Sequence, residues 1–365
     1  MGMRTDHVEG MIEEYPFDHI LQEDLNIIAN SSISFERMKE KTILVTGATG
    51  LIGVSIVRAL LCINRLKGYR IRILALVRNK EKAEKIYGNL LNRGYFNLVV
   101  GDINLEINID YPIDYIIHCA SITKSKTMVC EPVETLMTSI NGTHNILELA
   151  RNKKCKSVVY LSSMEVYGTI SSNSQDVREN DLGVIDPLKV RSNYPESKRL
   201  CENMCVAYLA EYGVPVKIAR LAQTFGAGIL ENENRVFAQF ARCAINNENI
   251  ILHTTGQSEG NYCYTRDVVR AIFIILLNGK NGTAYNVSNP DSHMTIFEMA
   301  TLVASQIADN RIKVIVDIHD NIDYGYAPAT KMKLNSDKIM NLGWKPEVSL
   351  KKSYERMIES MNSKK

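Results

Sequence analysis

Short apolar runs alternate with amphipathic helical segments between residues 41 and 228. Apolar runs of this length, separated by helices, are typical of parallel strands joined by crossovers, because such strands are buried on both faces. The pattern predicts an α/β fold with a doubly wound parallel sheet and a smaller C-terminal domain. Strands are expected within the segments 41–46, 70–78, 96–103, 114–121, 156–163 and 214–226.

The pattern changes on both sides of this region. DHILQEDLNIIA has helical periodicity, so residues 1–40 are predicted to be an N-terminal helical extension packed on the outside. Beyond residue 228 the alternation loosens, and two helical stretches are expected at 295–308 and 348–362. We predict a main domain over 41–228 and a smaller one over 229–365, with 263–289 returning to the main domain.

Composition narrows the class of protein. The chain is 45% apolar and 23% charged, and its formal net charge is +2. These values fit a globular protein and give no field that favours nucleic acid or a membrane surface. No apolar run has the length of a membrane span, and we see no signal peptide. The eight cysteines form no CxxC pair, so we expect no metal site and a reducing, cytoplasmic setting.

A glycine-rich turn follows the first predicted strand. GATGLIG places Gly47, Gly50 and Gly53 between that strand and a helix, with Leu51 and Ile52 in the first helical turn. Glycines in this context permit a tight turn, close backbone approach to a pyrophosphate and close packing of helix on strand. The helix N-terminus adds N–H groups and a positive dipole end. The segment therefore predicts a dinucleotide site in a Rossmann-type domain.

The ends of the next two strands bear on which dinucleotide binds. An acid at the end of the second strand would accept from both adenosine ribose hydroxyls, but the chain has Arg78 there, between Val77 and Asn79. Arg78 could pair with a 2′-phosphate, stack on adenine or remain solvated. We predict NAD(P), with a modest preference for NADP. After the third strand, Asp102 and Ile103 are placed to bind the adenine end.

The string SNYPESK sets Tyr194 one helical turn before Lys198. Residues four apart share a helix face, and a nearby ammonium favours tyrosinate, so it would lower the tyrosine pKa. Tyr194 is therefore a candidate acid/base for a substrate hydroxyl. The alternative is an ordinary surface Tyr–Lys pair.

GATGLIG, HCAS, YLSSMEVYG and YPESK, taken together in this order, resemble the extended short-chain dehydrogenase/reductases. More narrowly, the chain is similar over residues 41–362 to the NAD-dependent epimerase/dehydratase family, which modifies nucleotide-linked sugars. The nearest-looking branch contains UDP-glucuronate decarboxylases and sugar 4,6-dehydratases. The resemblance implies a nucleotide-sugar substrate and a substrate-binding role for residues 229–365.

The resemblance also implies roles for individual residues. Ala120 of HCAS would lie on the cofactor. Ser163, Tyr194 and Lys198 would act while a hydride passes from the sugar C4 to the nicotinamide, with Lys198 also holding the nicotinamide ribose. The resulting ketone would permit epimerisation, loss of water or loss of a carboxylate. Glu165 stands where dehydratases keep a base and decarboxylases a glutamate.

Several positions depart from the family pattern. Met164 replaces an acid or hydroxyl that protonates leaving water in many dehydratases, and a thioether cannot do this. Gly260 stands where an arginine usually grips the diphosphate. The substrate contacts that remain are candidates only: Gln223, Arg235 and Lys331, with Lys333 as an alternative to Lys331. Ser139 replaces a usual asparagine, as does Gln223.

The resemblance implies a homodimer that forms through the helices at 131–152 and 194–212. Two other functions stay open at this point. One is a net NADPH-dependent reductase of a keto-sugar or another carbonyl. The other is a non-catalytic cofactor-binding scaffold, which has no need of intact Ser163, Tyr194 and Lys198.

Overall fold

A computed structural model describes residues 13–170, 176–230, 233–318 and 331–363 of the chain. Its centre is a sheet of seven parallel strands in the order β11-β6-β5-β4-β1-β2-β3. The predicted doubly wound α/β fold is thus confirmed. The strands are β1 (Thr42–Thr46), β2 (Arg72–Val77), β3 (Phe96–Val100), β4 (Tyr115–His118), β5 (Ser157–Ser163), β6 (Val216–Leu221) and β11 (Ala284–Val287).

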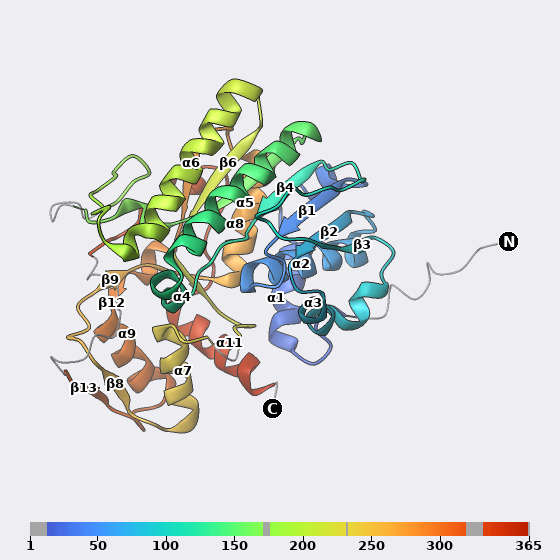
Figure 1. The fold of residues 1–365 in the computed structure, drawn as a ribbon. Coiled ribbons are helices and arrows are strands. Elements are labelled where there is room, and N and C mark those ends of the chain that lie inside the picture. Colours follow the sequence, from blue (N-terminus) through green and yellow to red (C-terminus); the bar gives the residue numbers. More distant parts are fainter. Residues whose placement is uncertain (1–12, 171–175, 231–232, 319–330, 364–365) are drawn as a thin grey trace.

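Helices cover both faces of this sheet (Figure 1). Alternate strand residues belong to buried clusters on opposite faces. On one face, Ile43 and Val45 of β1 share a buried cluster with α2 and α8. On the other, Leu44 packs in a cluster with residues of α5 and α6. The period of two along a strand explains this division. The main helices of the two layers that cover the sheet are α2 (Leu51–Lys67), α3 (Lys80–Tyr87), α5 (Pro132–Asn152), α6 (Asn193–Tyr212) and α8 (Thr265–Asn278).

Two strand assignments need correction or extension. The sixth segment, expected as one strand over 214–226, breaks after Leu221, and β7 (Gln223–Phe225) pairs instead with β10 (Tyr262–Tyr264). At the break, the Ala222 amide N–H donates to the carbonyl of Val287. The segment 263–289 supplies α8 and the seventh strand, β11, which pairs with β6. The domain boundaries themselves stay a prediction.

The elements of the smaller lobe lie at the lower left of Figure 1 and pack around a buried hydrophobic cluster of their own. Stacked Phe225 and Phe237 rings, 4.6 Å apart, lie in this cluster. The elements of this lobe are α7 (Val236–Asn246), β8 (Ile250–Leu252), β9 (Glu259–Gly260), β12 (Met294–Thr295), α9 (Ile296–Leu302), the π-helix η6 (Val303–Ile307), β13 (Val314–Val316) and α11 (Leu350–Asn362). Shorter elements elsewhere are η1 (Phe35–Met38), η2 (Gly88–Asn92), α4 (Ser125–Cys130), η3 (Met164–Tyr167), η4 (Val190–Ser192), η5 (Pro290–Ser292) and α10 (Asp337–Met340).

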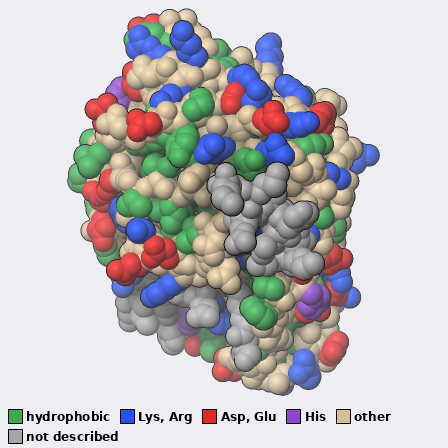
Figure 2. Space-filling view, turned by 90° about the vertical axis from the view of Figure 1, so that its right-hand side faces the viewer, with side chains coloured by type: hydrophobic (Ala, Val, Ile, Leu, Met, Phe, Trp, Pro, Cys, Tyr) green, Lys and Arg blue, Asp and Glu red, His purple; other side chains and the backbone are tan. Residues whose placement is uncertain are grey.

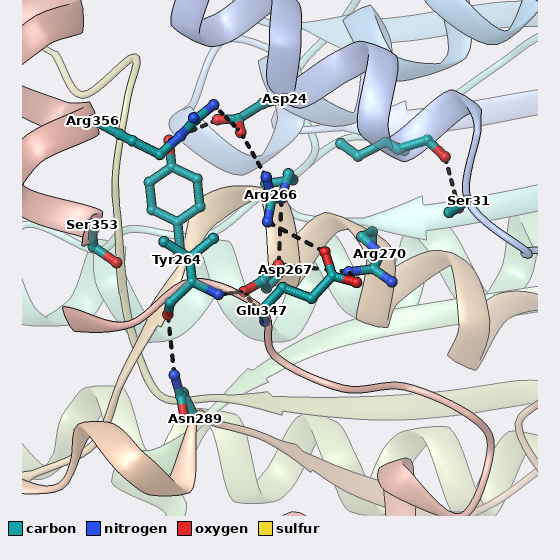
Figure 3. Close-up of polar contacts among 12 residues, drawn as sticks. Asp24, Ser31, Tyr264, Arg266, Asp267, Arg270, Asn289, Glu347, Ser353 and Arg356 are labelled. Atoms are coloured by element: carbon teal, nitrogen blue, oxygen red, sulfur yellow. Dashed lines mark hydrogen bonds and ion pairs between the residues drawn. The ribbon is translucent and has the colours of Figure 1, made fainter. Parts of the chain in front are cut away.

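The N-terminal extension is tied into the fold more firmly than a helix packed on the outside would be. Its helix α1 (His19–Ala29) contacts α2, α8 and α11. Upstream of it, the buried Glu14 carboxylate accepts from both Arg65 and Arg93. Within it, Asp24 is buried among arginines of α8 and α11, as Figure 3 shows. Buried charges must be paired, so these contacts fix where the extension lies.

The surface has no strong segregation of charge on the face drawn in Figure 2, where acidic and basic side chains are interspersed. Among the described residues, no helix has the length and apolarity needed to cross a bilayer. The same residues contain no cluster of three or more His, Cys, Asp or Glu side chains that could hold a metal ion. The eight cysteines are all free thiols.

Candidate active site

The glycine turn has the geometry that a dinucleotide requires. Gly47 has a φ of +61°, and a Cβ there would lie 2.8 Å from the amide nitrogen of Ala120. A Cβ on Gly53 would lie 2.3 Å from the carbonyl oxygen of Gly47. Gly50 caps α2 with no side-chain hydrogen bond, so the first N–H groups of that helix stay available to a ligand. Half-buried Leu51 and Ile52 belong to this first turn. The turn therefore fits a pyrophosphate.

The other predicted cofactor residues follow neighbouring strands at the same edge of the sheet. Arg78 comes directly after β2 and is exposed, with no hydrogen bond or ion pair among the described residues. Asp102 follows β3 closely, and its Oδ1 accepts from the Asn104 amide N–H at 2.9 Å. Ile103 packs beside Gly142 of α5. Ala120 follows β4 and donates its N–H to the Thr46 hydroxyl.

The predicted catalytic residues come together at this edge. Ser163 is the last residue of β5, and Tyr194 and Lys198 lie in the first two turns of α6. The Lys198 Nζ donates to the Leu161 carbonyl at 2.8 Å and lies 5.8 Å from the centre of the Tyr194 ring. Tyr194 and Lys198 are both buried, which excludes the surface Tyr–Lys pair.

The expected lowering of the tyrosine pKa is wrong for the protein alone. Burial raises the pKa of Tyr194 to about 12, and the charge of Glu165 raises it further. A hydrogen bond from Ser163 and the charges of Arg191 and Arg235 lower it, but not enough to offset burial. Burial also lowers the pKa of Lys198 to about 8. Desolvation disfavours the charged form of each group, and it is the largest cause of both pKa shifts.

Glu165 has a partner that the sequence analysis did not assign. Its carboxylate oxygens lie 3.1 and 3.0 Å from Nη2 of Arg191, in η4. Arg191 stands three residues before Tyr194 in RSNYPESK. This proximity was the only feature of the sequence that could have indicated a role for Arg191 near the tyrosine. Met164, between Ser163 and Glu165, is buried in an apolar cluster with Met332 and Leu334.

The proposed substrate residues are less closely gathered. Arg235 pairs with Glu233, whose oxygens lie 3.1 Å from Nε and 2.7 Å from Nη2, and its charge reaches Tyr194. Gln223 is half-buried in β7, while Lys331 is exposed. Ser139 is turned toward its own helix, where its hydroxyl donates to the Thr135 carbonyl. Gly260 lies in β9, close to the Met164 methyl group.

A buried polar network supports the catalytic strand from behind. Arg220 on β6 donates to both oxygens of Glu202 on α6, at 2.9 and 2.7 Å. The Ser162 hydroxyl donates to the same carboxylate, and Arg220 also reaches the Tyr167 hydroxyl. These contacts hold β5, β6 and α6 in register next to Ser163. Sequence reasoning missed the network because its members are far apart in the chain.

His118, at the end of β4, is a packed and buried residue. Its Nδ1 lies 2.8 Å from the Thr46 hydroxyl and its Nε2 3.4 Å from that of Thr143. Burial lowers the pKa of His118 to about 3, so the ring is neutral.

A dinucleotide-type glycine turn and a Ser–Tyr–Lys group on a doubly wound sheet define a nicotinamide-dependent enzyme of the short-chain dehydrogenase/reductase type. The sequence model that describes the NAD dependent epimerase/dehydratase family matches residues 43–288 of this chain. The chain belongs to this family.

Relatives and structural neighbours agree with this membership. The chain is 29% identical over 322 residues to UDP-glucuronic acid decarboxylase 1 of Danio rerio, covering 87% of this chain and 72% of the relative. It is 27% identical over 340 residues to dTDP-D-glucose 4,6-dehydratase of Bos taurus, covering 87% and 88%. The fold is similar to that of dTDP-glucose 4,6-dehydratase from Bacillus anthracis, solved with NAD, with a TM-score of 0.69 at 19% identity over 88% and 96% of the two chains.

Proposed function

We propose that this chain uses a nicotinamide dinucleotide to oxidise a nucleotide-activated sugar at C4, and that the ketone so formed enables a second change in the sugar. The observation that carries the proposal is the placement of Ser163, Tyr194 and Lys198 at the edge of the sheet that bears the glycine turn. A non-catalytic scaffold has no need of this complete set, buried at one site.

The roles of the chain's own residues follow from their chemistry. Ser163 and Tyr194 bind the reacting hydroxyl, and Tyr194 accepts its proton. Lys198, fixed by the Leu161 carbonyl, presents a cation beside the tyrosine and the ribose site. When bound, the oxidised nicotinamide supplies the hydride acceptor and a positive charge that favours tyrosinate.

The second change is decided by the residues after Ser163. Loss of water from the sugar needs a proton donor for the leaving hydroxyl, and the buried Met164 thioether cannot supply one. Loss of a carboxylate as CO₂ leaves an enolate at the ketone, which needs only a proton. Glu165, paired with Arg191, is an acid/base at this position. We infer that decarboxylation or epimerisation suits the site better than dehydration. The decarboxylase relatives make UDP-glucuronic acid the first substrate to test.

The experiment is to incubate the purified protein with UDP-, GDP-, CDP- and dTDP-linked sugars, including UDP-glucuronic acid, and to follow the products by NMR. We expect one donor to be converted with the cofactor unchanged overall, and oxidised dinucleotide to copurify with the protein. Failure of every donor to react, with cofactor bound, would refute the proposal.

One observation favours the second candidate, a net NADPH-dependent reductase. Arg78 is exposed at the end of β2, where its guanidinium could pair with a 2′-phosphate. Stoichiometric consumption of NADPH with a keto-sugar would support this candidate, whereas catalytic turnover with retained oxidised cofactor would exclude it. For either reaction we propose NADP as the preferred dinucleotide.

We also propose a homodimer formed through α5 and α6. These helices pack on each other, and they carry exposed apolar side chains, including Val133, Met137, Leu200 and Val206. An apolar stripe of this kind is stabilised when a second copy covers it. A cytoplasmic location stays a prediction.

A further inference from the structure

We propose that Arg191 is a positioning residue, which holds the Glu165 carboxylate and balances its charge beside the Tyr194 hydroxyl. The inference deepens the proposed function and rests on it, because it assumes that Tyr194 is the acid/base. It concerns a residue that neither the glycine turn nor the Ser–Tyr–Lys group contains.

The first observation is the geometry of the pair. Nη2 of Arg191 lies 3.1 and 3.0 Å from the two Glu165 oxygens, so a single guanidinium nitrogen bridges the carboxylate. The side chains are 20% and 32% exposed, which is less than in an ordinary surface ion pair. They come from η4 and η3, two turns that are distant in sequence but meet at the end of β5. The pair therefore fixes where the carboxylate lies relative to Ser163.

The second observation is the position of the pair beside the tyrosine. The guanidinium carbon of Arg191 lies 5.9 Å from the centre of the Tyr194 ring. The charged groups that face this ring come from four elements: Glu165 of η3, Arg191 of η4, Lys198 of α6 and Arg235 before α7. The buried hydroxyl of Tyr160, on β5, is also near. Glu165 is the one anion in this group, and Arg191 is bonded to it.

The charges have opposite effects on Tyr194. Glu165 raises the pKa of the tyrosine, and Arg191 and Arg235 lower it. Loss of Arg191 would leave the Glu165 charge uncompensated next to a hydroxyl that must ionise. Loss of Glu165 would leave the Arg191 charge free to favour tyrosinate. A residue that served only to brace the two turns would produce no such opposite pair of effects.

The third observation is an unsatisfied donor. Nε of Arg191 is buried and has no hydrogen-bond partner among the residues that the structure describes. Buried donors in folded proteins are usually paired, so this nitrogen has capacity left for an acceptor that a bound ligand brings. Nε of Arg58, Arg266 and Arg270 is unsatisfied in the same way, so this donor supports the geometric argument and does not carry it.

The test measures Tyr194 directly and needs no turnover. NAD⁺-loaded protein with [¹³Cζ]tyrosine is titrated by NMR between pH 7 and pH 10.5, and the Tyr194 signal is assigned by its absence from Tyr194→Phe. The variants are Arg191→Gln, Arg191→Lys, Glu165→Gln and the double variant Arg191→Gln/Glu165→Gln. Lys189→Gln, an exposed cation of the same loop paired with Asp186, is the matched control.

We expect the titration midpoint of Tyr194 to rise by about one pH unit in Arg191→Gln and to fall by about as much in Glu165→Gln. The double variant should titrate close to wild type, and Arg191→Lys should recover most of the shift, because it keeps the charge. Lys189→Gln should not move the midpoint. The inference is overturned if Arg191→Gln and Glu165→Gln shift the midpoint in the same direction or not at all.

Turnover is a separate measurement, so the two proposals can fail independently. If the opposite shifts appear but no nucleotide sugar is converted, the charge balance holds and the proposed reaction is wrong. If a sugar is converted and the shifts are absent, the reaction stands and Arg191 only braces the loop.

Discussion

The Asp24 carboxylate of α1 lies 2.7 Å from Nη2 of Arg356 on α11, and joins residues 332 positions apart in the chain. The same carboxylate accepts from the Tyr264 hydroxyl at 2.7 Å and lies 3.5 Å from Arg266 of α8 (Figure 3). Both members of the closest pair are less than 10% exposed. The N-terminal extension is therefore anchored by a buried ion pair in addition to the buried apolar face of α1.

We predict that Asp24→Ala lowers the free energy of unfolding by about 3–5 kcal/mol, because it removes the buried anion that Arg356 and Arg266 share. Urea unfolding followed by circular dichroism measures this. Glu23→Ala is the control, since Glu23 pairs with the same Arg356 but is 54% exposed. Its loss should cost about 1 kcal/mol or less. Equal losses in the two variants would contradict a special role for Asp24.

The same carboxylate should make stability depend on pH. Burial raises the pKa of Asp24 to about 6, although Arg356, Tyr264 and Arg266 lower it. Between about pH 4 and pH 6 the folded chain therefore holds a proton that the unfolded chain has released. This stabilisation is present below the unfolded pKa and is lost as the pH rises through the folded pKa.

We accordingly expect the stability of wild type relative to Asp24→Asn to fall by up to about 3 kcal/mol between pH 4 and pH 7. Urea unfolding of both proteins at four pH values gives this difference. A difference that grows with pH would mean that the arginines stabilise the charged carboxylate more than burial destabilises it.

A comparison of Gly53→Ala with Gly50→Ala should separate the effect of packing from the effect of ligand binding at the glycine turn. In Gly53→Ala the new Cβ would meet the Gly47 carbonyl at 2.3 Å, so α2 must move, and we expect a loss of about 1–3 kcal/mol of stability together with cofactor affinity. Gly50→Ala meets only one atom, at 3.4 Å, and should lower cofactor affinity with little effect on stability. Gly94→Ala, with no atom within 4 Å of its Cβ, is the control. Thermal unfolding and dinucleotide titration would check all three.

Tyr194→Phe should leave fold and dinucleotide binding intact and lower turnover by on the order of 10²-fold or more, because it removes a positioned acid/base. Steady-state kinetics with the substrate found by NMR gives the ratio. Tyr212→Phe, at the exposed end of α6, is the matched control. Activity of Tyr194→Phe at the wild-type level would remove this residue from the mechanism.

Arg78 should set the choice of dinucleotide. We expect NADP(H) to bind more tightly than NAD(H), Arg78→Ala to erase most of the difference, and Arg78→Glu to reverse it. A hydrogen bond to a charged group contributes about 1.5–3 kcal/mol. Because Arg78 is exposed, we expect the difference in binding free energy between NADP(H) and NAD(H) to be smaller than this. Calorimetric titration of both dinucleotides into each variant, with Lys80→Ala as control, decides this. A wild-type preference for NAD(H) would show that Arg78 is solvated or stacks on adenine.

The chain should sediment as a homodimer at micromolar concentration. Met137→Glu and Val206→Glu place charges on the exposed apolar positions of α5 and α6 and should shift it toward monomer. Leu66→Glu alters an equally exposed apolar position on α2 and should leave the dimer unchanged. A wild-type monomer, or dissociation by Leu66→Glu, would place the interface elsewhere or remove it.

The sequence by itself determined the features that depend on local pattern. Alternation of apolar runs with helices located six strands of the central sheet, because burial on both faces leaves a continuous apolar signature. The glycine spacing located the turn at Gly47, Gly50 and Gly53, because few other residues tolerate such close backbone approach. The four-residue spacing of Tyr194 and Lys198 placed them together on α6, because helical geometry is local.

Tertiary structure decided what depends on contacts between distant segments. The pairing of Glu165 with Arg191, and of Asp24 with Arg356, has no local signal, because charged side chains are common and only folding chooses their partners. The direction of the Tyr194 pKa could not be read from its spacing to Lys198, because desolvation by the whole surrounding fold outweighs one nearby charge. The last strand of the sheet, β11, likewise joined β6 through a crossover that no local periodicity specifies.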